Sequence, residues 1–492
     1  MTVLPEVKQD YGRMCNYING QWVESDSARE LDVMNPSTGE SIGTVPLSTK
    51  KEVDEAVEAA HNAFWQWRTT PPINRARVLM ALRELLEKNR EELARIVVQE
   101  HGKTIDDARG EVQRAIEAVE VATGIPSLMM GYNLEDVSAG IDEYCIRQPL
   151  GVFAAIAPFN FPLMVPFWFL PFAIGCGNTF VLKPSEQVPI SMQRVMSLVE
   201  AAGFPPGVVN LVNGDKEAVD GLLDNPKVVG VSFVGSSPVA RYIYRRASEQ
   251  GKRVQCQGGA KNFIVVMPDA DLDQTVPNLL SSFFGSAGER CLAGSVLLAV
   301  GDVYEPLKEK FAAAAARMKI GYGLDESVGI GPVISKSHRD RILGYIDKGI
   351  AEGAKLILDG RQVKVANYPE GYYVGPTIFD KATPQMTIAR EEIFGPVGAI
   401  IPVEDLEEAM GIIDDCPFGN AASIFTGSGK AARTFQYTVR CGNIGINIGV
   451  AAPMAFFPFS GMKDSFFGDL HAQGRDAFNF FTERKVVITR WF

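Results

Sequence analysis

The stretch that decides the fold is residues 151–186, which read GVFAAIAPFNFPLMVPFWFLPFAIGCGNTFVLKPSE. Two short runs in it, VFAAIAP and TFVLKPSE, are almost continuously apolar before a polar end, as strands buried on both faces of a parallel sheet are. The apolar segment from Ile156 to Leu182 resembles a membrane span in hydropathy but carries prolines at positions 158, 162, 166 and 171. Each proline removes a helix hydrogen bond that lipid cannot replace. The stretch therefore predicts a strand, a turn, a core helix and a second strand.

The same alternation of apolar strand and helix continues along the chain. Further strands are predicted at VVNLVNG, VVGVSFVGS and NFIVVMPDA, with helices beginning near Leu163, Pro189, Lys216 and Pro238. Beyond residue 291 the alternation returns in SVLLAVGD, AKLILDG, GAIIPVED, NAASIFTGS and GNIGINIGV. The first ~130 residues show 3.6-residue apolar spacing and are expected to be rich in helix. We therefore predict two α/β domains of similar size, which the length of 492 residues allows.

Composition narrows the classes of function. The formal net charge of −11 disfavours nucleic acid and anionic membranes as partners. The seven cysteines form no CxxC pair, and the four histidines are never spaced i, i+4, so we predict neither a disulfide framework nor a metal site. The first twenty residues lack a cationic segment leading into an apolar run. We therefore expect no secretory signal and a location in a reducing cytoplasm.

The C-terminal segment TERKVVITRWF, residues 482–492, reads as a strand without an obvious partner nearby in the sequence. Pairing with another subunit is one interpretation of it.

A dinucleotide site is only partly indicated by local patterns. VSFVGSSPVARYIYRRA predicts a strand, a turn and a helix whose first N–H groups can hold a pyrophosphate, but only Gly235 of the usual GxGxxG pattern is present. Lys183 and Glu186 follow the strand TFVLK and can bracket the hydroxyl groups of an adenosine ribose. The plainer interpretations are a simple strand–helix turn and an exposed loop with a helix cap.

Cys291 is the candidate nucleophile. It lies in SSFFGSAGERCLAGS, residues 281–295, a run of small residues that lets a substrate approach the backbone, and Arg290 brings positive charge to the thiol. Most free cysteines, however, are buried and inert. Asn160, in the apolar setting IAPFNFP, either caps a turn or offers its amide N–H₂ to a developing oxyanion. Glu391 and Glu392, in REEIFGPV, read by themselves as a solvated pair of acids.

Taken together, the motifs resemble those of the aldehyde dehydrogenase superfamily. PFNFP, KPSE, FVGS, GERC, EEIFGPV and PFSG occur in the order and spacing of that superfamily over nearly the whole chain. Within it, MVPFW, QGGAKN, FGSAGERC and AAPMAFFPFSGMKDSFFGDLHAQG are similar to the methylmalonate-semialdehyde dehydrogenases. These enzymes oxidise malonate and methylmalonate semialdehydes with NAD and transfer the acyl group to coenzyme A, which gives acetyl-CoA or propanoyl-CoA.

The resemblance implies an α/β aldehyde dehydrogenase fold with two Rossmann-like domains and a β oligomerisation arm. The NAD-binding domain would comprise residues 1–130 and 148–257, and the catalytic domain residues 258–465. The arm would comprise residues 131–147 and 466–492. A homo-oligomer, most simply a tetramer, is expected from the same resemblance.

The resemblance also assigns roles to single residues. Cys291 would be the nucleophile that forms a thiohemiacetal and then a thioester, and Asn160 would stabilise the oxyanion with the N–H of Cys291. Arg114 and Arg290 would hold the carboxylate of the substrate. The residues expected to contact NAD are Ala157, Phe159, Lys183, Glu186, Gln187, Gly235, Ser236, Gly258, Glu392 and Phe394.

The most informative departure from the superfamily is VQCQGGAKNF. Hydrolytic aldehyde dehydrogenases carry Glu-Leu-Gly-Gly here, and their Glu activates water; this chain has Cys256 and Gln257 where Glu-Leu would stand. Without a base, water is a poor nucleophile, whereas a thiol with a pKa of about 8.5 is already partly ionised. The loss therefore favours transfer to coenzyme A. Phe263 and Gln187 replace a His and an Arg common in the subfamily, so the preference for NAD over NADP rests on the resemblance as a whole.

The sequence thus predicts an NAD-dependent, coenzyme-A-acylating oxidoreductase of malonate or methylmalonate semialdehyde. Two alternatives stay open. One is a hydrolytic NAD(P)-dependent dehydrogenase of another acidic aldehyde, such as succinate semialdehyde, and the other is a non-catalytic binding protein with the same fold.

Overall fold

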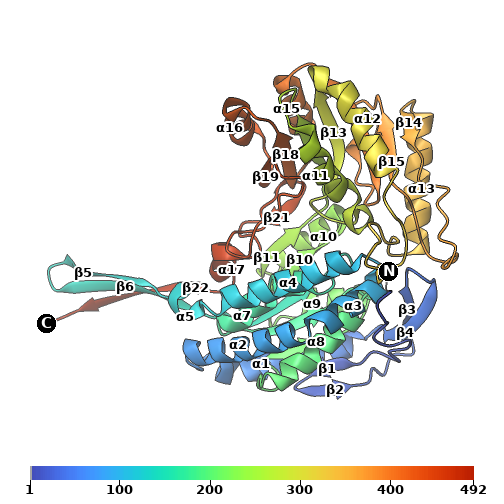
Figure 1. Ribbon diagram of the computed structural model, residues 1–492. Coiled ribbons are helices and arrows are strands. Elements are labelled where there is room, and N and C mark those ends of the chain that lie inside the picture. Colours follow the sequence, from blue (N-terminus) through green and yellow to red (C-terminus); the bar gives the residue numbers. More distant parts are fainter. Residues whose placement is uncertain (1–2) are drawn as a thin grey trace.

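The computed structural model describes residues 3–492 and is built around two large sheets with a separate β arm (Figure 1). The first sheet has eight strands in the order β2-β1-β9-β8-β7-β10-β11-β21. Its five central strands, β9-β8-β7-β10-β11, are parallel. The strands are β1 (Asn16–Ile18), β2 (Gln21–Val23), β7 (Val152–Ile156), β8 (Thr179–Lys183), β9 (Val209–Leu211), β10 (Val228–Val234), β11 (Arg253–Gln257) and β21 (Phe466–Gly468).

Alternate residues of these strands face two different cores. On β7, Phe153 and Ala155 join one apolar cluster, and Val152, Ala154 and Ile156 join the other. Because both faces are buried, the strands read as continuous apolar runs, which confirms the predicted strand pattern at residues 152–158 and 179–186. The accompanying helices are α1 (Lys50–Trp67), α2 (Pro72–Lys88), α3 (Arg90–His101), α4 (Ile105–Ala122), α5 (Ile125–Leu128), α6 (Met164–Phe167), α7 (Leu170–Gly175), α8 (Ile190–Ala201), α9 (Lys216–Asp224) and α10 (Ser237–Ser248).

The second sheet has seven strands in the order β14-β15-β16-β13-β12-β18-β19 and is parallel except for the β14–β15 pair. Its strands are β12 (Asn262–Val266), β13 (Gly294–Val300), β14 (Lys355–Leu358), β15 (Thr377–Asp380), β16 (Val397–Val403), β18 (Ala421–Phe425) and β19 (Asn443–Ile446). Its helical segments are α11 (Leu272–Phe284), η1 (Gly285–Gly288), η2 (Gly301–Val303), α12 (Tyr304–Ala315), α13 (Lys336–Ala351), α14 (Thr387–Arg390), α15 (Leu406–Asp415) and α16 (Gly429–Thr438).

The arm is a three-stranded antiparallel sheet that projects from the body (Figure 1). Its order is β22 (Glu483–Arg490), β6 (Ile141–Gln148) and β5 (Tyr132–Ser138). The C-terminal strand therefore has a partner in its own chain, because β22 pairs with β6 from Glu483↔Gln148 to Arg490↔Ile141. A partner more than 300 residues away leaves no local sign in the sequence. Because β22 is an edge strand of the arm sheet, its pairing with another subunit along the other edge stays a prediction.

Two other segments differ from the expectation. Within residues 466–492, expected to lie in the arm, β21 pairs with β11 and α17 (Gly474–Phe480) contacts α7, so both pack on the first sheet. The first ~130 residues are helical only from α1 onward. They begin with β1, β2 and the hairpin of β3 (Glu30–Asn35) and β4 (Glu40–Pro46), strands with too little apolar alternation to be recognised. A further short pair joins β17 (Phe418–Gly419) and β20 (Met462–Lys463).

The segment from Ile156 to Leu182 folds as predicted, with the end of β7, α6, α7 and most of β8 inside the core. None of the helices within residues 3–492 combines the length and the apolar composition needed to cross a bilayer.

Candidate active site

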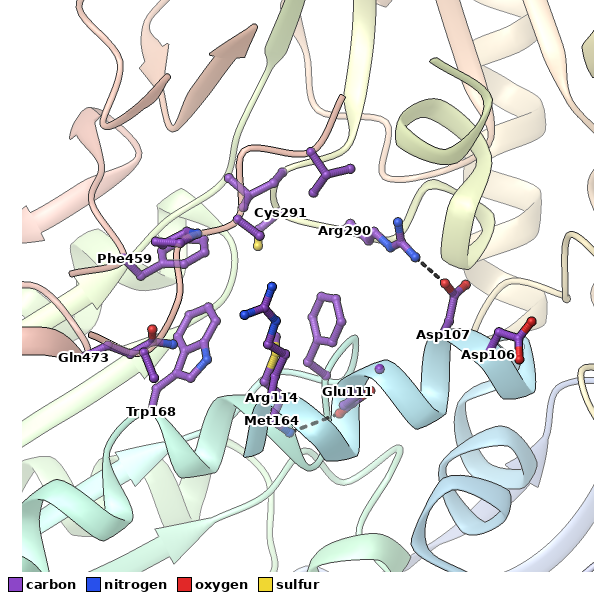
Figure 2. A pocket seen from close by; sticks show the side chains of 17 residues that line it. Asp106, Asp107, Glu111, Arg114, Met164, Trp168, Arg290, Cys291, Phe459 and Gln473 are labelled. Carbon is purple, nitrogen blue, oxygen red and sulfur yellow. Dashed lines mark hydrogen bonds and ion pairs between the residues drawn. The ribbon is translucent and has the colours of Figure 1, made fainter. Parts of the chain in front are cut away.

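A cavity of about 340 Å³ surrounds the thiol of Cys291 (Figure 2). Helix α4 forms one wall, the segment from Phe161 to Trp168 a second, and the turn of Arg290–Leu292 a third. Residues 450–459 complete it. We call this cavity the Cys291 pocket. Its walls are largely apolar, with charged side chains from α4 and from Arg290.

The backbone before Cys291 is unusual. Helix α11 ends in the short segment η1, where Ser286 and Ala287 have φ values of 48° and 52°. Such left-handed conformations cost free energy in a residue other than glycine, so the surroundings must maintain them. Gly288 (φ 76°) is required, because a Cβ there would lie 2.2 Å from the carbonyl oxygen of Gly395. We call residues 286–292 the nucleophile turn; it presents Cys291 from a tightly packed loop.

Two amide side chains anchor the nucleophile from the second sheet. The Nδ2 atoms of Asn262 and Asn420 donate to the carbonyl oxygen of Cys291 at 2.9 and 2.8 Å. The sequence showed both residues at the entrance of apolar strands, but only the fold brings them to one carbonyl. They were missed as candidate site residues for that reason.

Electrostatics make the resting thiol a weak acid. Burial, and after it the nearby Glu392 carboxylate, raise the pKa of Cys291, which reaches about 12. The backbone N–H groups of Cys291 and Leu292 lower this pKa, and the positive charge of Arg290 lowers it least. The expectation that Arg290 activates the thiol therefore does not describe the net effect, in which desolvation dominates.

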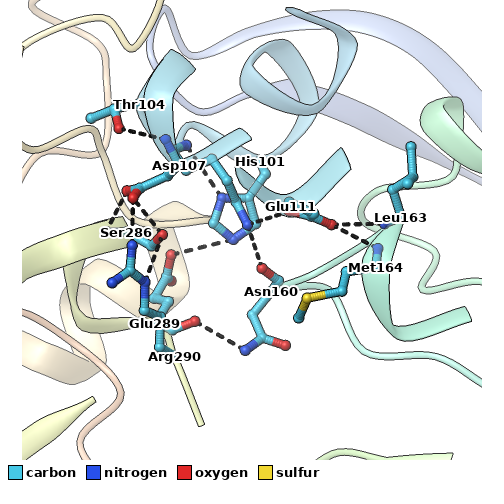
Figure 3. A network of polar contacts seen from close by, with 11 residues as sticks. His101, Thr104, Asp107, Glu111, Asn160, Leu163, Met164, Ser286, Glu289 and Arg290 are labelled. Atoms are coloured by element: carbon cyan, nitrogen blue, oxygen red, sulfur yellow. Dashed lines mark hydrogen bonds and ion pairs between the residues drawn. The ribbon is translucent and has the colours of Figure 1, made fainter. Parts of the chain in front are cut away.

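Asn160 lies at the centre of a buried polar network (Figure 3). Its Nδ2 donates to the carbonyl oxygen of Glu289 at 3.0 Å, two residues before the nucleophile. The ammonium of Lys103 donates to the carbonyl oxygen of Asn160 at 2.7 Å and to Glu111 at 2.6 Å. Glu111 in turn accepts from the N–H groups of Leu163 and Met164. The turn that carries Asn160 is thus fixed on both sides.

The two candidate arginines occupy different environments. In Figure 2 the guanidinium of Arg114 points into the Cys291 pocket, whereas that of Arg290 points away from the thiol. Arg290 is ion-paired with Asp107 and also donates to Ser286 Oγ and the Ser281 carbonyl, both at 3.3 Å. Arg114 has one ion pair, with Glu117 at 3.1 Å, and contacts the sulfur of Met454 at the rim. Arg114 is therefore the better placed of the two to receive an anion.

The structure shows which of Cys256 and Gln257 faces the Cys291 pocket, where hydrolytic relatives have a general base. Cys256 packs into the apolar cluster on the far face of the first sheet. Gln257 points to the opposite face, where its Nε2 lies 3.4 Å from the carbonyl oxygen of Phe459, a lining residue of the pocket. Successive strand residues face opposite sides. The side chain that replaces the base beside the pocket is therefore Gln257, and the placement of Cys256 there was off by one position.

The expected cofactor residues of the first sheet gather at one edge. Parallel strands end together, so Lys183 (β8), Ala157 (after β7), Gly235 (after β10) and Gly258 (after β11) lie along the carboxyl edge of the sheet. The Ala157 N–H donates to the Lys183 carbonyl at 3.0 Å, and that of Gly235 to the Gln257 carbonyl at 3.1 Å.

The polar groups at this edge suit a dinucleotide. Lys183 Nζ donates to Glu186 at 2.7 Å, which forms a donor–acceptor pair for a ribose. Ser236 precedes α10, a 12-residue helix whose first N–H groups the Ser236 side chain does not cap. A Cβ on Gly258 would lie 2.8 Å from both Asp464 O and Ser237 Oγ, so the edge is packed backbone to backbone. Gln187 is exposed, and its backbone N–H donates to Ser185 Oγ.

Glu392 and Phe394 lie on a loop between the two sheets. The Ala260 N–H donates to Glu392 Oε1 at 2.8 Å, and burial raises the pKa of Glu392 to about 7. Phe394 has a φ of 60° and meets the ring of Phe159 edge-on at 5.8 Å. Phe263, which departs from the subfamily pattern, is a buried residue of the second core. Among residues 3–492, no cluster of His, Cys, Asp or Glu side chains suits a metal ion.

Comparisons with known proteins identify the family. The model of the aldehyde dehydrogenase family matches residues 22–487. The chain is 52% identical to malonate-semialdehyde dehydrogenase 2 of Geobacillus kaustophilus over 97% of this chain and 98% of that protein. It is 51% identical to malonate-semialdehyde dehydrogenase of Halalkalibacterium halodurans, again over 97% and 98% of the two chains.

Solved structures give the same result. The crystal structure of methylmalonate-semialdehyde dehydrogenase from Oceanimonas doudoroffii superposes with a TM-score of 0.96 at 49% identity and covers 98% of both chains. The NAD⁺ complex of an aldehyde dehydrogenase from Bacillus cereus superposes with a TM-score of 0.92 at 31% identity, over 97% and 96% of the chains. The protein belongs to the aldehyde dehydrogenase family and has its fold.

The electrostatics of Cys291 predict how fast its thiol reacts at different pH. Because its pKa is raised to about 12 and only the thiolate reacts, alkylation by iodoacetamide should accelerate about tenfold per pH unit from pH 7 to 10 without a plateau. Replacing Glu392 by Gln removes a negative neighbour and should increase the rate at pH 8. Mass spectrometry of the Cys291 peptide, with Cys291→Ser as control, measures both rates. A plateau at or below pH 8.5 would contradict this assignment.

Proposed function

We propose that the protein oxidises malonate or methylmalonate semialdehyde with NAD and transfers the acyl group to coenzyme A. The observation that carries the proposal is the Cys291 pocket itself: a nucleophilic thiol, a guanidinium that faces it from Arg114, and the amide of Gln257 where hydrolytic relatives have a carboxylate. The relatives named for malonate and methylmalonate semialdehyde support the choice of substrate.

The first step is addition of the Cys291 sulfur to the aldehyde carbon. A carbon–sulfur bond forms, and the carbonyl oxygen becomes an oxyanion. An Asn side chain carries two N–H groups, and the Glu289 carbonyl engages one of Asn160's. The other, together with the backbone N–H of Cys291, would stabilise the oxyanion. Arg114 would hold the substrate carboxylate so that the aldehyde lies against the thiol.

Lys183 and Glu186 would hold the adenosine ribose of NAD, and the N-terminus of α10 at Gly235 and Ser236 would hold its pyrophosphate. Ala157, Phe159, Gln187 and Gly258 would line the same edge. Glu392 and Phe394 would contact the ribose and the ring of the nicotinamide. When bound, NAD accepts the hydride that the thiohemiacetal carbon releases. A thioester is then left on Cys291.

The last step is release of the acyl group. A thiol of coenzyme A attacks the thioester carbonyl, and the Cys291 thiolate leaves. Acetyl and propanoyl products have one carbon fewer than malonate and methylmalonate semialdehydes. The bond between the α-carbon and the carboxylate therefore breaks, carbon dioxide leaves, and the α-carbon takes up a proton from water. Gln257 has no basic group with which to activate water, which slows the competing hydrolysis.

The arm supports a proposal about assembly. Tyr132, Leu134, Val486, Ile488 and Trp491 expose between 60% and 70% of their surface on it, more than an isolated chain usually tolerates in one place. We propose a homo-oligomer, most simply a tetramer, that covers these side chains. The division into an NAD-binding domain, a catalytic domain and the arm belongs to the same proposal, as does a cytoplasmic location.

Product analysis tests the proposed reaction. With malonate semialdehyde and NAD, the protein should form acetyl-CoA and carbon dioxide rapidly only when coenzyme A is present. Mass spectrometry should detect the acylated Cys291 peptide when coenzyme A is omitted. Fast turnover to a free acid without coenzyme A would favour a hydrolytic dehydrogenase of another semialdehyde. Unreactive Cys291 and no NADH would favour a non-catalytic protein.

Replacing Arg114 tests the carboxylate contact. Loss of hydrogen bonds to a charged group costs about 1.5–3 kcal/mol, so Arg114→Ala should raise the KM for malonate semialdehyde about 10-fold to 100-fold. The KM for propanal, which has no carboxylate, should stay within about twofold. Arg109→Ala is the matched control, because Arg109 lies on the same helix but pairs with Glu91 and Glu326 on the surface. Equal effects on both aldehydes would remove this role.

Replacing Gln257 by Glu tests the choice between thiol and water. A carboxylate at this position restores a general base beside the pocket, which should increase the release of free acid without coenzyme A about a hundredfold. Cys256→Glu is the contrasting variant, since that side chain faces the apolar core, and it should produce no hydrolysis. Identical ratios of free acid to acyl-CoA in Gln257→Glu and the parent protein would refute the position of Gln257 beside the Cys291 pocket.

A further inference from the structure

One face of α13 holds the loop that carries Glu392 and Phe394. His338 Nε2 donates to the Phe394 carbonyl at 2.7 Å. The two terminal nitrogens of Arg341 donate to the Ile393 carbonyl at 2.6 Å and to the Glu392 carbonyl at 2.8 Å. The three consecutive carbonyls of residues 392–394 are thus bound from one helix.

The helix period explains why these side chains act together. His338, Arg341 and Tyr345 are spaced i, i+3 and i+7, so they lie on one face of α13. The Tyr345 hydroxyl continues the row by donating to Glu391 Oε2 at 2.6 Å, and the Arg341 guanidinium packs 4.9 Å from the Tyr345 ring. We call these three residues the α13 clamp.

The loop needs such support. Phe394 has a φ of 60°, a left-handed conformation that costs free energy for a bulky residue and is maintained only by its surroundings. The hydrogen bonds from α13 to the carbonyls of residues 392–394 fix the orientation of these peptide groups. The peptide groups in turn set the direction of the Glu392 and Phe394 side chains.

The same loop also abuts the nucleophile turn. The carbonyl of Gly395 lies so close to Gly288 that a Cβ there would be 2.2 Å away, and Glu392 Oε2 would lie 2.6 Å from a Cβ on Gly259. His338 Nε2 is also 3.5 Å from Glu289 Oε1, in the residue whose carbonyl accepts from Asn160. The loop is therefore packed both against the turn before Cys291 and against Gly259, which follows β11.

We propose that the α13 clamp, with Arg341 as its principal member, positions the loop that contacts the nicotinamide end of NAD. These are positioning residues, because they act through Glu392 and Phe394. The inference rests on the proposed use of NAD and goes beyond it, since it assigns a function to residues outside the contact set.

Arg341 also affects the charge on Glu392. Burial raises the pKa of Glu392 to about 7 even though the Ala260 N–H and two facing cations, Lys261 beside β12 and Arg341 on α13, act to lower it. The Cys291 thiol faces Glu392 from the nucleophile turn. Removing the Arg341 charge therefore raises the pKa of Glu392 further. NAD affinity should fall as the pH drops and Glu392 becomes neutral; we call this fall the acid limb. Without the Arg341 charge, the acid limb moves to higher pH.

The test is direct titration of NAD by protein fluorescence, together with steady-state kinetics. Arg341→Gln should raise the dissociation constant and the KM for NAD about tenfold and shift the acid limb upward, with the KM for malonate semialdehyde unchanged within about twofold. Arg341→Lys keeps the charge but loses the fork, so NAD affinity should fall while the acid limb stays in place. Arg339→Gln is the matched control, because Arg339 lies on the same helix and, within residues 3–492, forms its ion pair with the neighbouring Asp340 and not with the loop.

NAD affinity in Arg341→Gln equal to that of Arg339→Gln would overturn the proposal. An equal rise in both KM values with a lowered unfolding temperature, shared by Arg341→Lys, would also overturn it and would show a purely structural role. If Arg341→Gln does not fold, Arg341→Lys provides the test. Lower NAD affinity with an unshifted acid limb supports the proposal, and NAD affinity equal to that of the parent protein overturns it. NAD titration needs no turnover, so a parent protein that binds NAD but makes no acetyl-CoA would remove the proposed substrate and leave the clamp standing.

Discussion

The site depends on one hydrogen bond between two loops that belong to different sheets. The amide of Asn160, on the turn after β7, donates to the carbonyl of Glu289, two residues before Cys291 on the way into β13. The proposed reaction needs a sulfur from one loop and an oxyanion donor from the other at nearly the same point. A displacement of about 1 Å between them is enough to reduce such a rate severely. The fold meets this requirement by joining the two loops with a direct hydrogen bond.

That bond is maintained by buried charge. Lys103 and Glu111 are fully buried, only 2.6 Å apart, and each also binds backbone of the Asn160 turn. An ion pair inside a protein rarely adds much net stability, because both charges lose water. Breaking it is costly, however, since the partner is left unpaired, and its geometry is therefore well defined. Here the pair orients the Asn160 turn, which suits the proposed role of Asn160 in presenting one N–H to a substrate.

The sequence predicted those parts of the protein whose patterns are local. Continuous apolar strands at Val152–Ile156 and Thr179–Lys183 follow from burial on both faces, and GERC and PFNFP single out Cys291 and Asn160. Long-range pairing could not be read in this way. Strand β22 finds β6 across most of the chain, and Asn262 and Asn420 meet at the Cys291 carbonyl although no spacing links them. The register of β11 is the finest example. Whether Cys256 or Gln257 faces the pocket depends on which side of the sheet each occupies, and an error of one residue reverses that side.

The two arginines show why residue type alone does not determine a role. Both carry the same planar cation, and both line the Cys291 pocket. Arg290 is next to the nucleophile in sequence, yet its guanidinium turns to Asp107, Ser286 and the Ser281 carbonyl. There it braces the turn in which Ser286 and Ala287 adopt strained backbone angles. Arg114 is 177 residues from Cys291 in sequence, but helix α4 directs it into the pocket, with one ion pair at its base. An anion entering the pocket competes with a single carboxylate for Arg114, whereas at Arg290 it would have to displace a carboxylate and two further acceptors. The distant arginine is therefore better placed for the proposed contact with an anion, and the adjacent one supports the backbone that holds the thiol.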